Sequence, residues 1–323
     1  MDEEDDDAPI RGEVRLASHE RISHGLYRRK RHGLTSDDQF VRELECYQLV
    51  LPANAVFTHL TGARLLGWQL PKLPEQVPVF AAVGVRDPRP RRHGLLCSRL
   101  VRTPRPRRGM GGLPVDDPEE ILLRAARDLG VLDLVVLIDS ALAKGHLDRQ
   151  RMAELLATRR PGVRMLRVAY ELSDHRAESG PETVLRLFHR AIAVGVQPQV
   201  ELFDDRGTSI GRVDLLVVGT AFVHEYDGAH HRDQAQHRSD LRRERRFADS
   251  PYVRRGFTLD DLLNHPAIAM HEIDRTLDRP HDLRRLAVWR RVVDNSLYSE
   301  VGRERVMNRW RRQQGIIDWS RTA

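Results

Sequence analysis

Apolar positions recur at helical spacing in several stretches of the N-terminal half of the chain. Residues 36–38, Ser-Asp-Asp, look like a cap for an amphipathic helix that runs through Val50. Residues 54–66 carry apolar side chains three or four positions apart and predict a second helix, closed by Gly67. Further helices are predicted over residues 119–129, 132–142 and 147–157, the first of them capped by Asp116, Asp117 and Pro118.

Other stretches follow the pattern of strands and loops. Residues 77–85, Val-Pro-Val-Phe-Ala-Ala-Val-Gly-Val, predict a strand, whereas the Arg- and Pro-rich segment 86–108 predicts loops and edge strands. Residues 252–257 predict a further strand. The basic tail beyond residue 280 reads as helical and packs either on the protein or on nucleic acid; its tryptophans are Trp289, Trp310 and Trp319.

The most informative stretch is residues 212–232. Asp214 opens one apolar run, and after a turn at residues 219–220 a second run carries Glu225 and Asp227. Side chains alternate faces along a strand, so Glu225 and Asp227 point the same way, and antiparallel pairing brings Asp214 close to them. Three converging carboxylates repel one another electrostatically, and a bound divalent cation such as Mg²⁺ offsets this repulsion. The pattern predicts a metal site that acts on phosphates, although a lone Asp at a strand end is more often a turn cap.

These residues resemble the core of a known nuclease superfamily. The spacing Asp-x(10)-Glu-x-Asp-Gly with a following His is similar to the core of the PD-(D/E)XK nucleases, and within them to the small domain related to the very-short-patch repair endonuclease. Upstream, ESGPETVLR puts Glu182 in the place of the family's first acidic residue. Downstream, DLRRERR carries Asp240 and Arg243 on a helix that members also have. The resemblance covers roughly residues 175–265.

The resemblance implies a restriction-endonuclease-like three-layer α/β domain that hydrolyses phosphodiester bonds in DNA with Mg²⁺ or Mn²⁺. It implies that Asp214 and Glu225 hold the metal and that Glu182 reaches it directly or through water. His231 would shuttle a proton or contact phosphate, because imidazole titrates near neutral pH. The superfamily's Lys, two residues after the Glu, is Asp227 here, as it is in the closer relatives. Proton transfer would therefore fall to metal-bound water, His231 or a neighbouring acid.

Each of these residues also has a structural alternative. An exposed helix glutamate such as Glu182 is more often a solvated charge, and His231 is equally well a surface histidine beside an arginine. His224 and His230 are expected to face away from the site. Degenerate nuclease folds can also persist as binding modules. The rival hypothesis is therefore a catalytically silent DNA-binding or antitoxin-like regulator.

The amino-acid composition indicates the class of protein and the kind of partner it binds. The chain has 323 residues, enough for two domains with separate cores, and is 40% hydrophobic and 31% charged, as in soluble proteins. Its net charge of +6 and its abundance of Arg suit a DNA partner, although a GC-rich genome gives the same bias. Two cysteines, Cys46 and Cys97, fit a reducing compartment. Without a membrane-length apolar stretch or a secretory start, we expect a cytoplasmic protein with no membrane partner.

Basic clusters lie at residues 28–31, 89–92, 105–108 and 242–246. The last cluster follows the acidic site directly, so it is the one predicted to contact DNA phosphates. The residues predicted to bind nucleic acid are Arg232, Arg242, Arg243 and Arg246. Arg243 would also steady the carboxylates or the phosphate. The cluster at residues 89–92 is expected to be merely solvated.

The N-terminal region carries a second resemblance. Residues 2–7 are all acidic and predict a disordered tail. The following blocks, which include LPANAVFTHLTGARLLGW and GLPVDDPEEILLRAARDLG, are similar to the C-terminal part of AbiEi-type antitoxins of type IV toxin–antitoxin systems. That resemblance implies a cognate toxin as a possible partner. The family's N-terminal winged helix has no room in the roughly twenty preceding residues, so a scaffold that positions the nuclease is an equally good interpretation.

We therefore predict an α/β protein in which a mixed α+β N-terminal domain precedes a restriction-endonuclease-like three-layer α/β domain. The predicted parts are an acidic disordered tail (1–20), the antitoxin-like domain (21–170), the nuclease-like domain (171–275) and a basic helical extension (276–323). The leading hypothesis is a metal-dependent DNA endonuclease of DNA repair or of defence against mobile elements and phage. Its rival is the silent regulator.

Overall fold

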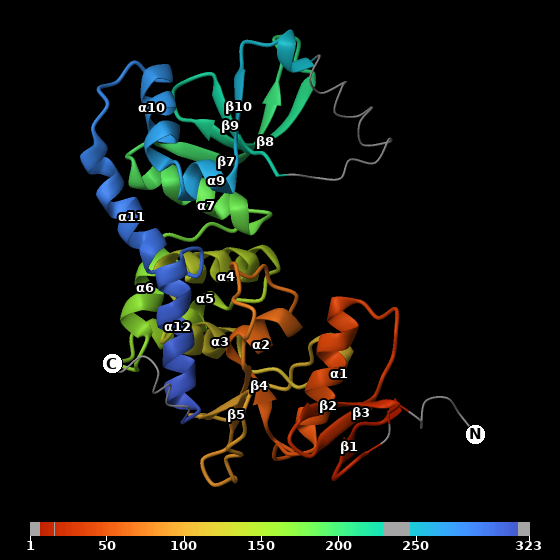
Figure 1. Ribbon diagram of the computed structural model, residues 1–323. Helices are drawn as coiled ribbons and strands as arrows, with labels where there is room; N and C mark the ends of the chain where they lie inside the picture. Colours follow the sequence, from red (N-terminus) through yellow and green to blue (C-terminus); the bar gives the residue numbers. More distant parts are fainter. Residues whose placement is uncertain (1–6, 16, 229–245, 316–323) are drawn as a thin grey trace, which may run out of the picture. The chain divides into compact units, whose positions relative to one another are not determined.

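The computed structural model describes residues 7–15, 17–228 and 246–315. It is a mixed α and β protein that forms two compact units (Figure 1). The first unit is drawn from residues 1–129, 147–166 and 303–323, and the second from residues 130–146 and 167–302. The units are therefore not contiguous in the sequence, because residues 130–146 belong with the second unit and residues 303–323 with the first. Within the described ranges, no helix is long and apolar enough to cross a membrane.

A small antiparallel sheet opens the first unit. Its strands lie in the order β1-β3-β2, and helix α1 contacts β3. The bounds are β1 (Ile10–Arg11), β2 (His19–Ser23), β3 (Leu26–Arg29) and α1 (Ser36–Gln48). Because β1 and the start of β2 fall within residues 1–20, the expectation of disorder throughout this tail is wrong. Asp7 forms ion pairs with Arg28 and Arg42, which ties the chain to this sheet, whereas residues 1–6 lie outside the described ranges.

Helix α1 confirms the predicted helix, with its cap moved by one residue. Thr35 is the N-cap, and its side chain accepts from Asp38 N while the Asp38 carboxylate accepts from Thr35 N. This reciprocal capping box satisfies two backbone donors that would otherwise have no partner at the helix start. The helix ends at Gln48, close to the predicted end at Val50.

The second sheet of this unit corrects one helix prediction. Its strands lie in the order β4-β5-β6, with β4 antiparallel and β6 parallel to β5. Their bounds are β4 (Val56–Phe57), β5 (Val79–Val83) and β6 (Leu95–Arg99), and helix α2 spans His59–Leu65. The strand predicted over 77–85 and an edge strand within 86–108 are confirmed. The prediction of a helix over residues 54–66 is wrong in its first half. There Val56 and Phe57 form β4, because their β-branched and aromatic side chains pack well in a sheet and are buried where β4 pairs with β5.

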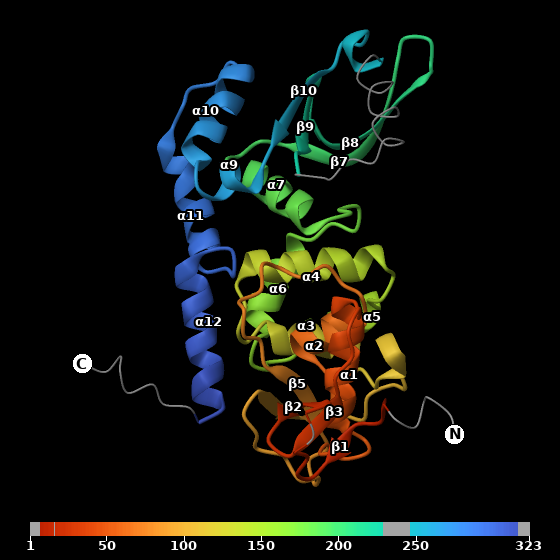
Figure 2. The same ribbon diagram turned by 45° about the vertical axis from the view of Figure 1, so that its right-hand side comes forward.

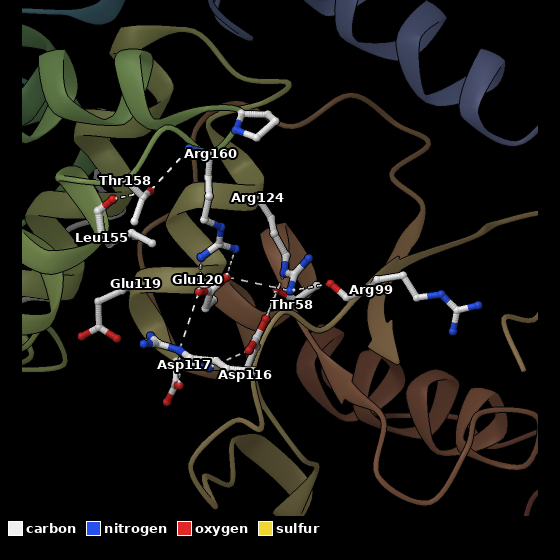
Figure 3. A network of polar contacts seen from close by, with 12 residues as sticks. Thr58, Arg99, Asp116, Asp117, Glu119, Glu120, Arg124, Leu155, Thr158 and Arg160 are labelled. Carbon is white, nitrogen blue, oxygen red and sulfur yellow. Dashed lines mark hydrogen bonds and ion pairs between the residues drawn. The ribbon is translucent and has the colours of Figure 1, made fainter. Parts of the chain in front are cut away.

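Helices complete the first unit. They are α3 (Pro118–Ala125), α5 (Arg149–Leu156) and the 3₁₀ turn η2 (Met110–Gly112), while α6 (Val163–Glu171) and α12 (Glu300–Gln313) run from one unit into the other. The predicted start of α3 is confirmed in position, because Asp117 is the N-cap residue and Pro118 follows in the first turn, but the Asp117 side chain makes no capping hydrogen bond. Instead Asp116 accepts from Thr58 and Arg124 in a buried polar network (Figure 3), and Asp117 accepts from Arg105.

The second unit is built on a four-stranded sheet in the order β10-β9-β8-β7. Neighbours β7 and β8, and β8 and β9, are antiparallel, whereas β9 and β10 are parallel. The bounds are β7 (Val196–Phe203), β8 (Ser209–Val217), β9 (Phe222–Tyr226) and β10 (Val253–Phe257). Helix α7 (Gly180–Ala191) lies along the sheet in both views (Figure 1, Figure 2) and contacts β7 and β9, while α4 (Val131–Ala143) packs on α7. The strands predicted around residues 214, 225 and 252–257 are confirmed.

The C-terminal segment packs on the protein. In the second unit it forms α9 (Leu259–Leu263), α10 (Pro266–Thr276), η3 (Leu283–Arg285) and α11 (Leu286–Asp294). Trp289 of α11 is buried and donates its Nε1–H to the Leu262 carbonyl at 2.7 Å. Trp310 of α12 is buried in the first unit, where it donates to Asp128 at 3.0 Å. Trp319 lies outside the described ranges.

Candidate acidic site of the second unit

Glu182 stands in the first turn of helix α7, where it is held by hydrogen bonds from its own helix start. The N-cap Ser179 accepts from Glu182 N at 3.3 Å and donates its hydroxyl to Glu182 Oε1 at 2.8 Å. The other oxygen, Oε2, accepts from Glu178 N at 2.9 Å. A carboxylate is favoured at this position by the positive end of the helix dipole. Glu182 is therefore fixed and half-buried, unlike the freely solvated helix glutamate of the structural alternative.

Gln199 of β7 joins Glu182 to Asp214. Its amide Nε2 donates to Glu182 Oε2 at 2.9 Å and towards Asp214 Oδ1 at 3.4 Å. Gln199 lies between Pro198 and Val200, whose partners on β8 are the two neighbours of Asp214, so it faces Asp214 across the strand pair. Its φ of 53° is costly for a residue with a side chain. The backbone is therefore strained at the residue that bridges the two acids.

Asp214 lies in the interior of β8 and not at its opening, because the strand already begins at Ser209. Its Oδ2 accepts from the backbone N–H of Tyr226 at 2.8 Å. The pairing of β8 with β9 runs through Leu215–His224 and Leu216–Val223, and Asp214 is the next residue along β8. The carboxylate thus satisfies a strand N–H beyond the last paired residues, which explains how an acid is accommodated in an apolar strand.

Glu225 and Asp227 lie in different environments, although the sequence predicted that they would share one. Glu225 is buried in β9, with 5% of its surface exposed, and forms an ion pair with Arg254 of β10. Asp227 is exposed one residue beyond the end of β9, and its backbone N–H donates to the Phe257 carbonyl at 2.8 Å. A Cβ placed on Gly256 of β10 would come within 2.7 Å of Asp227 Oδ2, so this glycine leaves room for that carboxylate. Asp227 thus borders β10 at the strand end, while Glu225 is neutralised inside the sheet.

The structure therefore brings together part of the predicted site. Glu182 and Asp214 meet at Gln199, and Glu225 follows at the next register position on β9. Among residues 7–15, 17–228 and 246–315, no group of three or more His, Cys, Asp or Glu side chains is arranged to hold a metal ion. The expected convergence of Asp214, Glu225 and Asp227 is thus not found, because a buried ion pair and a strand end separate their environments.

Several predicted residues lie outside the described ranges. They are His230, His231, Arg232, Asp240, Arg242 and Arg243. Arg246 is described, and its side chain is exposed, with Nη1 donating to the Ser209 carbonyl at 2.9 Å. It is therefore anchored at the start of β8, the strand that carries Asp214.

His224 lies away from the acids, as expected, in a buried pair with His189 of α7. Nδ1 of His224 is 2.7 Å from Nε2 of His189, whose Nδ1 is 2.8 Å from the Leu185 carbonyl. A carbonyl only accepts, so His189 Nδ1 carries the proton and its Nε2 accepts from His224. Burial lowers the pKa of His189 to about 4, and burial followed by the neighbouring His189 lowers the pKa of His224 to about 3. Both rings are therefore neutral at physiological pH.

Sequence reasoning missed two members of this site, Gln199 and Arg254. The sequence held a signal for Gln199, because it is a polar residue in the apolar stretch before Asp214, and adjacent antiparallel strands place their side chains opposite one another. The Arg-Arg pair within the predicted strand 252–257 was a signal for Arg254. Neither signal fixes a partner without the strand register. Comparisons with protein-family models, with curated proteins and with solved structures give no match for this chain, so its function is inferred from its own residues.

Proposed function

We propose that the second unit is a metal-dependent DNA endonuclease domain with a restriction-endonuclease-like three-layer fold. The observation that carries this proposal is the meeting of Glu182 and Asp214 at one amide nitrogen of Gln199, with Glu225 at the next register position. The order of helix α7, three antiparallel strands and the parallel strand β10 is in line with the resemblance of the sequence to these nucleases. Hydrolysis of a phosphodiester bond is the proposed reaction.

The donor set of this site suits a hard divalent cation. Carboxylate oxygens are the ligands that Mg²⁺ and Mn²⁺ prefer, and Asp214 and Glu225 would hold the ion, with Glu182 reaching it directly or through water. When bound, the ion supplies charge stabilisation at the scissile phosphate. N–H donors now face these oxygens, and the Arg254 side chain on Glu225 is 37% exposed. Arg254 can therefore turn towards solvent where a cation replaces its charge.

Other residues of the chain would position the acids, move the proton of the attacking water and contact the DNA. Gln199 would hold Glu182 and Asp214 together through its amide nitrogen, at a position where the backbone has a φ of 53°. Asp227, exposed beyond the end of β9, and His231 are the proposed groups for moving the proton of the attacking water. Arg246, together with Arg232, Arg242 and Arg243, is proposed to contact the DNA backbone.

A second candidate function is a catalytically silent DNA-binding or antitoxin-like regulator that acts with a cognate toxin. The ion pair between Glu225 and Arg254 favours it, because a fixed guanidinium already neutralises one of the two proposed metal ligands. In this case Glu182 and Asp214 would serve as a helix cap and a strand cap. Either function is proposed for the cytoplasm.

Cleavage of supercoiled plasmid separates the two candidates. For the endonuclease we expect nicked and linear products with Mg²⁺ or Mn²⁺, and none with chelator. Glu225→Gln should lower the rate by at least about 100-fold, because it removes charge where the transition state needs an ion. Asp205→Asn, which changes an exposed acid between β7 and β8, is the matched control and should retain activity. Failure of the wild-type protein to cut duplex, mismatched and single-stranded DNA with both metals would favour the regulator.

A further inference from the structure

A cavity of about 660 Å³ lies wholly within the first unit. His59 and Phe80 contribute stacked rings to its lining, with centroids 4.0 Å apart. Other parts of the lining come from residues 89–92, from helix α3 with the residues after it, and from the C-terminal end of α12. The volume falls in the range of sites for small molecules, so the cavity can take a ligand of nucleotide size.

The lining of the cavity is strongly positive. Seven arginines line the cavity, and among the described lining residues the only carboxylate is that of Asp128. Asp128 is already engaged, because Arg309 Nε lies 2.6 Å and His59 Nε2 3.2 Å from its oxygens, and Trp310 donates to it at 3.0 Å. Burial opposes the charged form of Asp128, yet these partners outweigh it and lower its pKa. The carboxylate therefore leaves most of the arginine charge uncompensated.

The guanidinium of Arg124, which lines the cavity, is fixed by three hydrogen bonds. Arg124 donates to Asp116 at 3.0 Å and to the Arg99 carbonyl at 3.2 Å (Figure 3). It also donates to Ser98 Oγ at 2.8 Å. The nearby Arg127 has a lowered pKa, first because it is partly buried and then because Arg124 and Arg160 lie close to it. The closeness of Arg124 and Arg160 to Arg127 gathers positive charge beside the cavity, which an anion would relieve.

Three arginines of the lining, Arg89, Arg91 and Arg312, are exposed at the cavity. In the part of the chain that the structure describes, none of them forms an ion pair with a carboxylate. The cluster at residues 89–92, expected from the sequence to be merely solvated, thus lies beside arginines of α12 that are distant in the sequence. Such a gathering of like charges is unfavourable unless a counter-ion binds.

Backbone strain marks the same cavity. His59 has a φ of 53°, a conformation that costs energy in a residue with a side chain. That conformation places the ring flat against Phe80 and within 3.2 Å of Asp128. Strain of this kind concentrates at ligand sites, where the surrounding structure holds a side chain in a fixed direction.

We propose that this cavity binds a phosphate-bearing ligand of nucleotide size, with Arg89, Arg91 and Arg312 contacting the phosphate oxygens. The planar guanidinium matches phosphate with paired N–H donors. The phosphate belongs either to a free nucleotide or to the 5′ end of a DNA strand, because both present the same group. The proposal concerns the first unit and does not depend on nuclease activity in the second.

Calorimetric titration of the full-length protein at low salt tests this site. The probes are pyrophosphate, ATP, and a short DNA strand with either a 5′-phosphate or a 5′-hydroxyl. The double variant Arg91→Ala/Arg312→Ala should weaken binding by on the order of tenfold or more for each arginine removed. The control Arg149→Ala/Arg159→Ala removes the same charge from exposed positions of the first unit outside the cavity and should bind as the wild type does.

The outcomes are distinguishable. Binding of ATP or pyrophosphate that the cavity variant loses and the control keeps would support a nucleotide site. A preference for the 5′-phosphorylated strand, without binding of the free nucleotides, would support a site for DNA ends. No binding of any probe by the wild type, or equal losses in the two double variants, would overturn the proposal. Thermal melting checks that each variant is folded, and the single variants Arg91→Ala and Arg312→Ala repeat the test if the double variant is not.

Discussion

Two clusters of carboxylates, one in each unit, differ in what neutralises them. In the first unit, Asp116, Asp117, Glu119 and Glu120 at the start of α3 are all at most 3% exposed. Arginines face them, and the fork of Arg160 donates to both oxygens of Glu120 at 2.6 Å (Figure 3). Burial opposes the charge on Glu120, but Arg160 outweighs it and the pKa of Glu120 is lowered. This cluster is a closed network in which arginines neutralise buried carboxylates.

In the second unit the acids are held more loosely. Asp214 accepts from an amide and a backbone N–H, and Glu182 accepts from a hydroxyl and N–H groups. Glu225 faces Arg254, whose side chain is 37% exposed, and Asp227 is exposed. The hydroxyl, amide and N–H donors on Glu182 and Asp214 are neutral and do not cancel a negative charge, whereas Arg254 neutralises Glu225. We propose that the first cluster is a structural network and that the second binds an ion.

The largest expected effect is the loss of Arg124. Arg124→Ala leaves the carboxylate of Asp116 buried without its ion-pair partner, and should lower the free energy of unfolding by about 3–5 kcal/mol. Arg102→Ala is the control, because its side chain is 42% exposed and 3.7 Å or more from its acidic partners. It should cost less than about 1 kcal/mol. Urea denaturation followed by circular dichroism measures both, and equal losses would argue against a closed network.

Acid should destabilise the second unit through the His189–His224 pair. The unfolded chain binds protons near pH 6.5, whereas burial lowers the folded pKa values to about 4 and about 3. The free energy of unfolding should therefore fall as the pH drops below about 6.5, by up to roughly 1.4 kcal/mol per pH unit for each histidine. His189→Gln with His224→Gln should flatten this dependence, while His175→Gln, an exposed control, should not. If the melting temperature did not change between pH 6.5 and pH 4, the two histidines would not be held neutral by burial.

Arg254→Ala removes the positive charge that neutralises Glu225 in the acidic site. It leaves Glu225 buried without its ion-pair partner and should cost about 1–3 kcal/mol. In an ion-binding site, Mn²⁺ should restore much of that stability. Arg255→Ala, on the same strand and paired with Glu272 at 2.6 Å, is the matched control and should show no recovery. Thermal melting with and without Mn²⁺ measures both, and the same response in the two variants would count against a cation at Glu225.

The smallest effect concerns the salt dependence of DNA binding. Replacing Arg242, Arg243 and Arg246 with Ala should lower the slope of log affinity against log salt by about 0.9 for each phosphate that is no longer neutralised. Arg290→Ala, an exposed change on α11, should leave the slope unaltered. Fluorescence anisotropy with labelled duplex provides the measurement. An unchanged slope in the triple variant would mean that these arginines are only solvated.

Local signals were enough to predict much of the fold. The capped helix at residues 36–50, the strand at 77–85 and the strand at 252–257 were all found, because each is set by its own apolar pattern and end signals. The helix predicted over 54–66 failed where pairing with β5 outweighed local helical spacing. Tertiary burial decided the conformation of Val56 and Phe57, and no local pattern contains that information.

The candidate site was predicted only in part, for the same physical reason. Its acids were visible in the sequence, but the neighbours of those acids are distant along the chain. The approach of Gln199 to Asp214 depends on the register of β7 with β8, and that of Arg254 to Glu225 on the register of β9 with β10. Likewise, the sequence around Asp116 and Asp117 is typical of helix caps, and only the fold brings their arginine partners to them. Spacing identifies candidate residues, whereas charge balance requires the folded structure.

Calorimetric titration of Mn²⁺ into the full-length protein measures whether the acids of the second unit bind a divalent ion. We predict one weak site, with a Kd of roughly 10⁻⁴–10⁻³ M, that Asp214→Asn and Glu225→Gln each abolish. Asp214→Asn keeps an oxygen to accept from Tyr226, so its fold should persist. Asp205→Asn, which removes an exposed acid from the same unit, should bind as the wild type does. Absence of binding by the wild type, or identical binding by all four proteins, would contradict the claim.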